Sequence, residues 1–131
     1  MNVQNLGQIL TAIDLIPLAS VTADGNGTGV DIQQFDGELA VFLACKNTAG
    51  ATPTLDVTLE DSADNSSFAA IAGAAFTQVT DADTSAAVLL KLTIRADQVR
   101  RYIRAVKDIG GTSSPAFMTA CFAVGTKQVR S

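Results

Sequence analysis

The chain has 131 residues, which is enough for one domain with a single hydrophobic core and too few for two. Apolar residues make up 47% of it, which excludes a disordered chain. Only 17% of its residues are charged, so either part of the surface is covered by partners or the domain is simply neutral. The absence of histidine removes the usual acid–base group near neutral pH and, with it, the common Ser-His-Asp and Cys-His nucleophiles, so we expect no enzyme.

The first 27 residues are predicted to form an N-terminal arm or an edge segment of the domain. Leu6, Leu10 and Ile13 follow helical spacing, whereas Pro17 lacks an N–H and favours an extended chain around it. No basic region precedes the apolar residues, and no apolar run approaches ~18 residues. We therefore expect neither a signal peptide nor a membrane span, and a protein made and kept in the cytosol.

Alternation of apolar and polar residues predicts short strands separated by turn signals. The expected strands are residues 30–35, 38–47, 54–61, 86–94, 101–107 and 116–124. The segments 48–53 and 110–115 contain glycine and proline and are predicted to be hairpin loops. Residues 68–79 are expected to hold a short strand or irregular packing, with four core anchors: Phe68, Ile71, Phe76 and Val79. This pattern is typical of an antiparallel β-sandwich or barrel over residues 28–126, followed by a tail at 127–131.

Several segments resemble nucleotide-binding or metal-binding motifs, but the spacing of their residues does not match those motifs. The glycine-rich loop 23–29 is not a dinucleotide fingerprint, because Val30 stands where the third glycine is needed, and no Gly-Lys-Ser/Thr follows. The acidic loop at Asp61 and Asp64 lacks the alternating ligands and central glycine of a calcium loop. Cys45 and Cys121 have no metal-binding spacing and are expected to be buried thiols, with a disulfide left open. We predict no catalytic, metal-binding or cofactor-binding residue.

Charge is divided unevenly along the chain. Residues 1–90 carry 11 acidic residues and one basic residue, a net charge of −10, whereas residues 91–131 carry eight basic and two acidic residues, a net charge of +6. Two interpretations stay open: contact with a partner, or pairing between the two halves within the fold. Nucleic acid is not expected, because the whole chain is acidic, with a pI of about 4.5, and Tyr102 alone could stack a base near the basic strand.

Three stretches resemble small structural proteins of tailed bacteriophages and prophages. They are residues 31–45 (DIQQFDGELAVFLAC), residues 53–71 with 76–80, and a late Arg-Tyr-Ile-Arg strand at 101–104 that is followed by a Gly/Ser/Thr/Pro turn and an apolar strand. In those proteins an outward-facing strand ends in a Ser/Asp loop, and a phenylalanine then re-enters the core. The resemblance covers about residues 28–126 and implies a β-sandwich encoded among head genes, of the type that decorates or cements a capsid.

We therefore expect an all-β, antiparallel sandwich of jelly-roll type with seven to eight strands. The resemblance implies a non-enzymatic virion protein that binds the outer capsid surface and stabilises the head. Its expected partners are the major capsid protein and further copies of itself, as a dimer or trimer, with no nucleic acid, membrane or cofactor. The alternatives are a tail-tube, head–tail connector or fibre-associated protein, or a module that binds carbohydrate or a host surface. The candidate contact residues are Arg100, Arg101, Tyr102, Arg104, Lys107, Leu6, Leu10 and Ile13.

Overall fold

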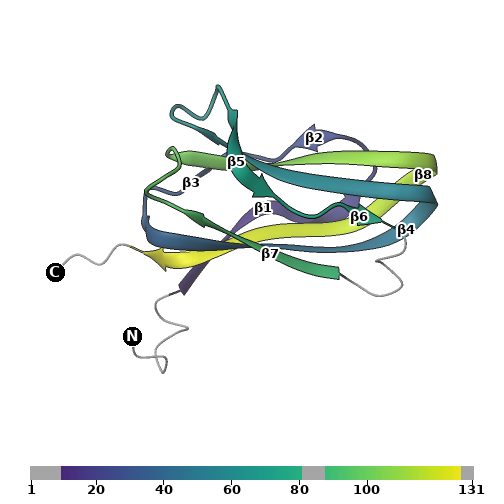
Figure 1. The fold of residues 1–131 in the computed structure, drawn as a ribbon, viewed down its shortest axis with the longest axis horizontal. Helices are drawn as coiled ribbons and strands as arrows, with labels where there is room; N and C mark the ends of the chain where they lie inside the picture. Colours follow the sequence, from purple (N-terminus) through teal and green to yellow (C-terminus); the bar gives the residue numbers. More distant parts are fainter. Residues whose placement is uncertain (1–9, 81–87, 128–131) are drawn as a thin grey trace.

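The computed structural model describes residues 10–80 and 88–127, and all regular secondary structure in these two ranges is β (Figure 1). The strands are β1 (Leu10–Val21), β2 (Gly25–Asn26), β3 (Val30–Asp31), β4 (Phe35–Ser62), β5 (Ala69–Ala75), β6 (Val79–Thr80), β7 (Val88–Arg95) and β8 (Tyr102–Lys127). All the pairings among them are antiparallel. The predicted all-β antiparallel class is confirmed.

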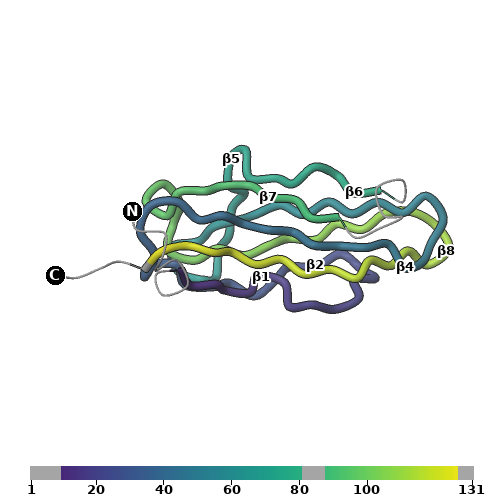
Figure 2. Tube along the Cα trace, turned by 90° about the horizontal axis from the view of Figure 1, so that it is seen from below, coloured from purple at the N-terminus to yellow at the C-terminus, as the bar shows by residue number. Residues whose placement is uncertain are grey.

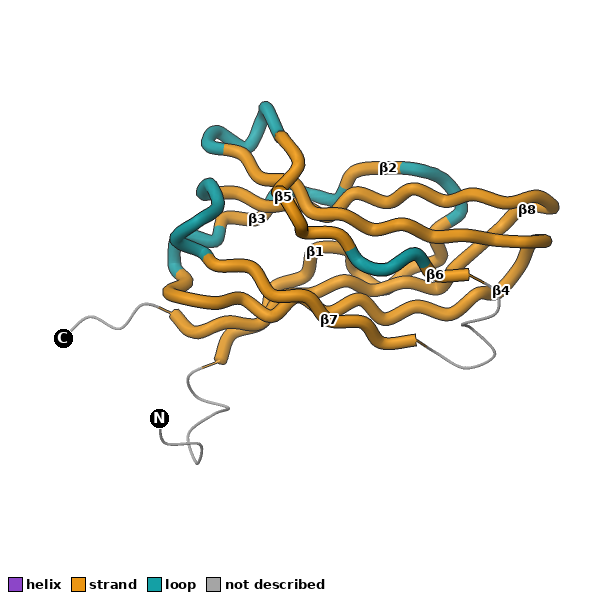
Figure 3. Tube along the Cα trace, viewed as in Figure 1, coloured by secondary structure: helices purple, strands orange, loops and turns teal. Residues whose placement is uncertain are grey.

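Two long strands organise the fold. β4 and β8 pair along almost their whole length, from Phe35 opposite Lys127 to Ser62 opposite Tyr102. Both strands bend at the same end of the molecule, where the register shifts between Asn47 and Thr54, and each then continues in the other layer (Figure 3). Each long strand therefore supplies one half to each of two packed sheets.

The first sheet contains β1, the C-terminal half of β8, the N-terminal half of β4, and β7, in that order (Figure 2). The second sheet contains β2 and β3, the N-terminal half of β8, the C-terminal half of β4, and then β5 and β6. Two four-column antiparallel sheets that exchange two long strands in this way form a jelly roll, as predicted.

The predicted hairpin loops at 48–53 and 110–115 are wrong. The strands that flank each segment lie in different sheets, and each of them pairs with the other long strand. Gly50 and Gly111 have φ values of +105° and +117°, which only glycine adopts easily. They allow β4 and β8 to bend side by side from one sheet into the other. The glycine and proline residues correctly predicted where the two strands change direction. They do not determine which strands pair beyond that point.

β1 is an edge strand. It pairs with the C-terminal half of β8 and buries Leu15, Ile16 and Val21, with irregularities in register on both sides of Ile16. Of the two expectations for the N-terminal segment, the edge segment therefore describes Leu10–Val21, and the helical spacing through Leu10 and Ile13 is not used. Residues 1–9 lie outside the described residues.

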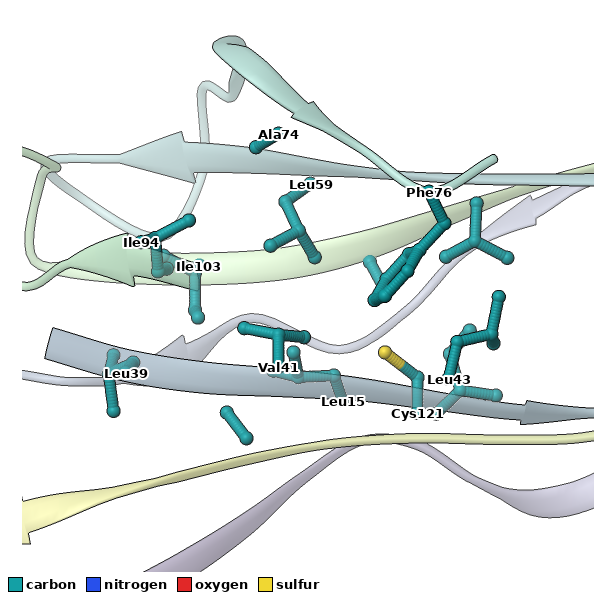
Figure 4. Packing of buried hydrophobic residues seen from close by; sticks show 14 of the residues in the cluster. Leu15, Leu39, Val41, Leu43, Leu59, Ala74, Phe76, Ile94, Ile103 and Cys121 are labelled. Carbon is teal, nitrogen blue, oxygen red and sulfur yellow. The ribbon is translucent and has the colours of Figure 1, made fainter. Parts of the chain in front are cut away.

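The core lies between the two sheets (Figure 4). Leu39, Val41 and Leu43 enter it from β4 of the first sheet, and Leu59 and Ile103 from the second. The predicted alternation on these strands is confirmed, because the residues between them in sequence face outward and are less buried. Burial of these branched side chains is the main force that holds the two sheets together.

The predicted anchors between residues 68 and 79 behave differently from one another. Phe76 and Val79 are buried, and Ile71 packs at the margin of the core, as predicted. The expectation that Phe68 re-enters the core is wrong, because its ring is half-buried beneath the guanidinium of Arg104, outside the core cluster. The local pattern did not distinguish these two environments for an aromatic ring.

The two cysteines are buried, as predicted. They lie on neighbouring strands of the first sheet, where Cys45 pairs with Thr119 and Cys121 pairs with Leu43. Burial raises the pKa of the Cys121 thiol to about 12, which keeps it protonated and unreactive in the folded protein.

The glycine-rich loop has a packing role at Gly27. The Gly27 N–H donates to the carbonyl oxygen of Ala105 at 2.6 Å. A Cβ at this position would lie 2.6 Å from the carbonyl oxygen of Leu15 and 2.9 Å from that of Ala105. The loop therefore needs glycine so that three backbone segments can meet.

Candidate protein-contact surface

The basic strand lies in the second sheet, at the start of β8. Ile103 and Ala105 point into the core, while Tyr102 and Arg104 alternate with them on the outer face. Lys107 is half-buried opposite Val57. The structure thus places five predicted contact residues, Arg100, Arg101, Tyr102, Arg104 and Lys107, along one segment.

Three of these basic residues are paired with acids from the first half of the chain. Arg100 Nη2 lies 2.8 Å from Asp61 Oδ1, Arg101 Nη2 lies 2.8 Å from Asp31 Oδ2, and Arg104 Nη2 lies 2.7 Å from Glu60 Oε1, which together give three ion pairs. The pairing forms because β4 and β3 flank the N-terminal half of β8 on its two sides. Of the two interpretations of the uneven charge, pairing within the fold is therefore present, and a role in contacting partners remains a prediction.

The pair between Arg101 and Asp31 shifts the pKa of both of its members. The side-chain hydrogen bond from Arg101 lowers the pKa of Asp31 below its ordinary value, and the backbone N–H of Gln33 adds to the effect. The same bond raises the pKa of Arg101. Asp31 is therefore ionised at neutral pH and holds the arginine in place.

Arg104 is the most enclosed of the three arginines. Its side chain is 21% exposed, against 45% for Arg100 and 47% for Arg101. Its guanidinium carbon lies 4.0 Å from the centre of the Phe68 ring, in addition to the ion pair with Glu60. Cation–π contact and charge pairing together give Arg104 a role in holding the Phe68 segment on the sheet.

The N-terminal candidates do not join this surface. Leu10 is exposed and pairs with Thr126 at the margin of the first sheet, while Ile13 is partly buried against the core. Leu6 lies outside the described residues. Leu10 and Arg104 thus lie on the outer faces of opposite sheets, so the candidates do not form one continuous site.

Acidic groups meet near the other end of the second sheet. Asp108 lies opposite Asp56, and the Asp24 carboxylate accepts a hydrogen bond from the Ile109 N–H at 2.8 Å. The nearby charge of Asp24 is the main cause of a raised pKa at Asp108, to which Asp56 contributes less. Repulsion here is a small cost to folding at neutral pH.

The Ser/Asp loop after β4 is held by Asp64. Its Oδ1 atom accepts hydrogen bonds from the Ser62 hydroxyl at 2.9 Å and from the Ser66 and Ser67 N–H groups at 3.0 Å each. These bonds lower the pKa of Asp64. The carboxylate therefore organises a turn. Among residues 10–80 and 88–127, no cluster of three or more acidic or cysteine side chains could hold a metal ion.

The outer face of the first sheet is a second candidate surface, and of the predicted contact residues within the described ranges only Leu10 lies on it. Phe42 and Phe122 stack there with ring centroids 5.3 Å apart. The signal was present in the sequence, because residues 39–45 and 117–124 carry apolar side chains at both odd and even positions. A strand with one solvated face should alternate, so apolar residues on both faces indicate that both faces are covered.

No helix within the described ranges is long and apolar enough to cross a membrane. No protein-family model matches this sequence, and no curated protein matches it.

The fold defines the chain as a jelly-roll β-sandwich, and solved virus structures share it. A chain of the T13 particle of infectious bursal disease virus is similar with a TM-score of 0.60 and 16% identity over 90% of this chain and 31% of the viral chain. A chain of the Gx strain gives 0.57 and 10% identity over 93% and 33%, and the VP2 subviral particle gives 0.50 and 11% over 90% and 32%. This chain thus spans about a third of those viral chains, and at these identities the likeness is one of fold.

Proposed function

We propose that this protein is a non-enzymatic structural component of a virus particle that binds the outer surface of the capsid and stabilises the head, as a decoration protein of a tailed phage. The observation that carries the proposal is the fold, because nine-tenths of the chain superimposes on part of a chain from a virus particle. The phage assignment rests on the sequence resemblance over residues 28–126. The partners proposed with it are the major capsid protein and further copies of this chain.

The physical properties of the domain support such a role. Its charges are largely paired within the fold at β8, and its two sheets share long strands that cannot separate without breaking both. A protein that binds the assembled shell more tightly than free subunits stabilises the shell by mass action. Many identical sites on a capsid then multiply a modest affinity for each copy.

Arg100 and Arg101 are the better candidates for contact with the shell. About half of each side chain remains exposed, and both lie beside a shallow cleft of about 240 Å³ formed with Gln33, Asp36 and Asp97 at one end of the sandwich. Arg104 is a weaker candidate, because its pairing with Glu60 and Phe68 already uses its guanidinium.

The test is co-sedimentation of the purified protein with mature phage heads that lack it, quantified against the major capsid protein. Saturation at a fixed ratio near one copy per capsid subunit is the expected result. Absence from heads, together with presence on purified tails, would replace decoration with a tail or connector role. Retention on a glycan array in place of particles would instead favour the carbohydrate-binding alternative.

A further inference from the structure

The outer face of the first sheet is apolar across its two central strands. Six outward-facing side chains form a continuous field: Ala40, Phe42, Ala44, Ala120, Phe122 and Val124. The corresponding row of β4 in the second sheet is Thr54, Asp56, Thr58 and Glu60, which is the polar pattern expected of a solvated sheet. The two outer faces of the sandwich therefore have opposite character.

The apolar field extends to the margins of the sheet. Leu10, Leu89 and Met118 are the exposed large apolar residues around it, and Leu89 is 65% exposed. A shallow groove of about 360 Å³ crosses the face; its lining includes the apolar side chains of Leu10, Phe42 and Val124 and the polar side chains of Glu38 and Thr93. Continuous apolar surface of this kind is uncommon on a monomer and marks a site of association.

The outward-facing charges of this sheet include Asp14, Glu38, Lys46, Lys91 and Arg95, and two of them, Asp14 and Lys91, lie in one row. Asp14 on β1 pairs with Phe122, Phe122 pairs with Phe42, and Phe42 pairs with Lys91 on β7. The row therefore has an acid at one margin, a base at the other and two stacked rings between them (Figure 2 shows the order of the four strands). Three strand spacings separate Asp14 from Lys91 by roughly 14 Å, which is too far for them to pair within one chain.

We propose that this face is a homodimer interface, on which a second copy of the chain packs face to face about a two-fold axis parallel to the strands. That axis exchanges the two margins of the sheet, so Asp14 of each copy meets Lys91 of the other, and Phe42 meets Phe122 of the other. A two-fold axis perpendicular to the strands within the same plane would place Asp14 opposite Asp14, which repels. The row of Asp14 and Lys91 therefore favours the first of these two symmetric arrangements.

The size of the face suits this occupant. Four strands at about 4.8 Å spacing and four outward rows at about 6.8 Å spacing give a footprint of roughly 500 Å² on each copy. Two copies then bury roughly 1,000 Å² together, which reaches the lower limit for a specific interface. The proposal stands on this face alone and does not depend on the proposed capsid role.

Sedimentation equilibrium of the purified chain tests the proposal. The 13.5 kDa chain is expected to sediment with twice its monomer mass. Leu89→Glu should weaken the dimer by about tenfold or more, because each two-fold interface buries the new charge twice. Leu89 is exposed in the monomer, so this variant should fold. The matched control is Ala75→Glu, which adds the same charge beside Thr58 of the second sheet and should leave the dimer unchanged.

Charge exchange tests the orientation. Asp14→Lys and Lys91→Asp alone should each weaken the dimer by about tenfold, because each change places like charges together at two symmetric positions. The double variant should return to within about threefold of the original affinity. A dimer that both single variants weaken and the double variant does not restore would overturn the proposed axis.

Two results would overturn the interface itself. One is a monomer at the highest concentration the protein tolerates, and the other is a dimer that Leu89→Glu leaves unchanged. A monomer that still saturates phage heads would reject this inference and leave the proposed function standing. A dimer that responds to the variants as expected but binds neither heads nor tails would support this inference and reject the proposed function.

Discussion

Replacing Arg104 distinguishes a structural role from a contact role for the basic strand. Its ion pair with Glu60 at 2.7 Å joins side chains that are 21% and 24% exposed, so we expect about 0.5–1 kcal/mol from the pair. The contact with Phe68 at 4.0 Å adds about 0.5–1 kcal/mol. Arg104→Met keeps most of the apolar stem and removes both interactions, so it should lower the free energy of unfolding by about 1–2 kcal/mol.

Urea unfolding followed by circular dichroism measures this loss, and a double-mutant cycle with Phe68→Leu isolates the cation–π part. The matched control is Arg95→Met, because Arg95 and Asp97 form an ion pair at 3.2 Å whose side chains are 46% and 61% exposed. We expect little change in that variant. If Arg104→Met unfolds at the same urea concentration as the original chain, Arg104 does not hold the Phe68 segment, and the reasoning from its enclosure is wrong.

Three further outcomes are expected. Gly27→Ala should destabilise the protein by about 2 kcal/mol in urea unfolding, because its Cβ has no room between two carbonyl oxygens. Gly25→Ala should cost less, because its Cβ would meet only the Lys107 side chain, at an ordinary contact distance of 3.6 Å, and equal losses would contradict the packing argument. Asp108→Asn should raise the melting temperature at pH 7, because Asp24 raises the pKa of Asp108 and disfavours its charged form in the fold. That gain should fade as the pH falls below the ordinary pKa of an aspartate, and a gain that persists at low pH would point to another cause. The Cys121 thiol should react with a thiol reagent only as fast as the protein unfolds, since it is buried with a pKa of about 12, and rapid labelling of the native protein would show that the first sheet opens.

The sequence predicted the class of fold and the inward residues well, because period-two alternation depends on local sequence. Leu55, Val57 and Leu59 are buried as that alternation requires. The two corners could not be predicted in the same way. The same residue types, glycine and proline, occur where a chain turns back in a hairpin and where a strand bends into a second sheet. Only the long-range pairing between β4 and β8 shows which of the two is present.

The candidate contact surface was predicted as a segment, and the structure adds its electrostatic partners. Arg100 to Arg104 share one strand start, but their acids come from β3 and β4, more than 35 residues earlier in the chain. Sequence could show that the acids and bases were segregated without showing that the fold brings them together. The sequence indicated the apolar outer face through apolar residues at both odd and even positions of 39–45 and 117–124, but the extent of that face depends on the register between β4 and β8.

The pairing of Phe35 with Lys127 also has a consequence for biosynthesis. The first sheet needs both of these segments, and 91 residues separate them, so its central pair cannot form on the ribosome until almost the whole described chain has emerged. Domains dominated by such distant pairings fold in milliseconds to seconds. The edge of β4 that pairs with β8 therefore stays unpaired while the chain is completed, and high-level expression of this protein should depend on chaperones that shield that strand.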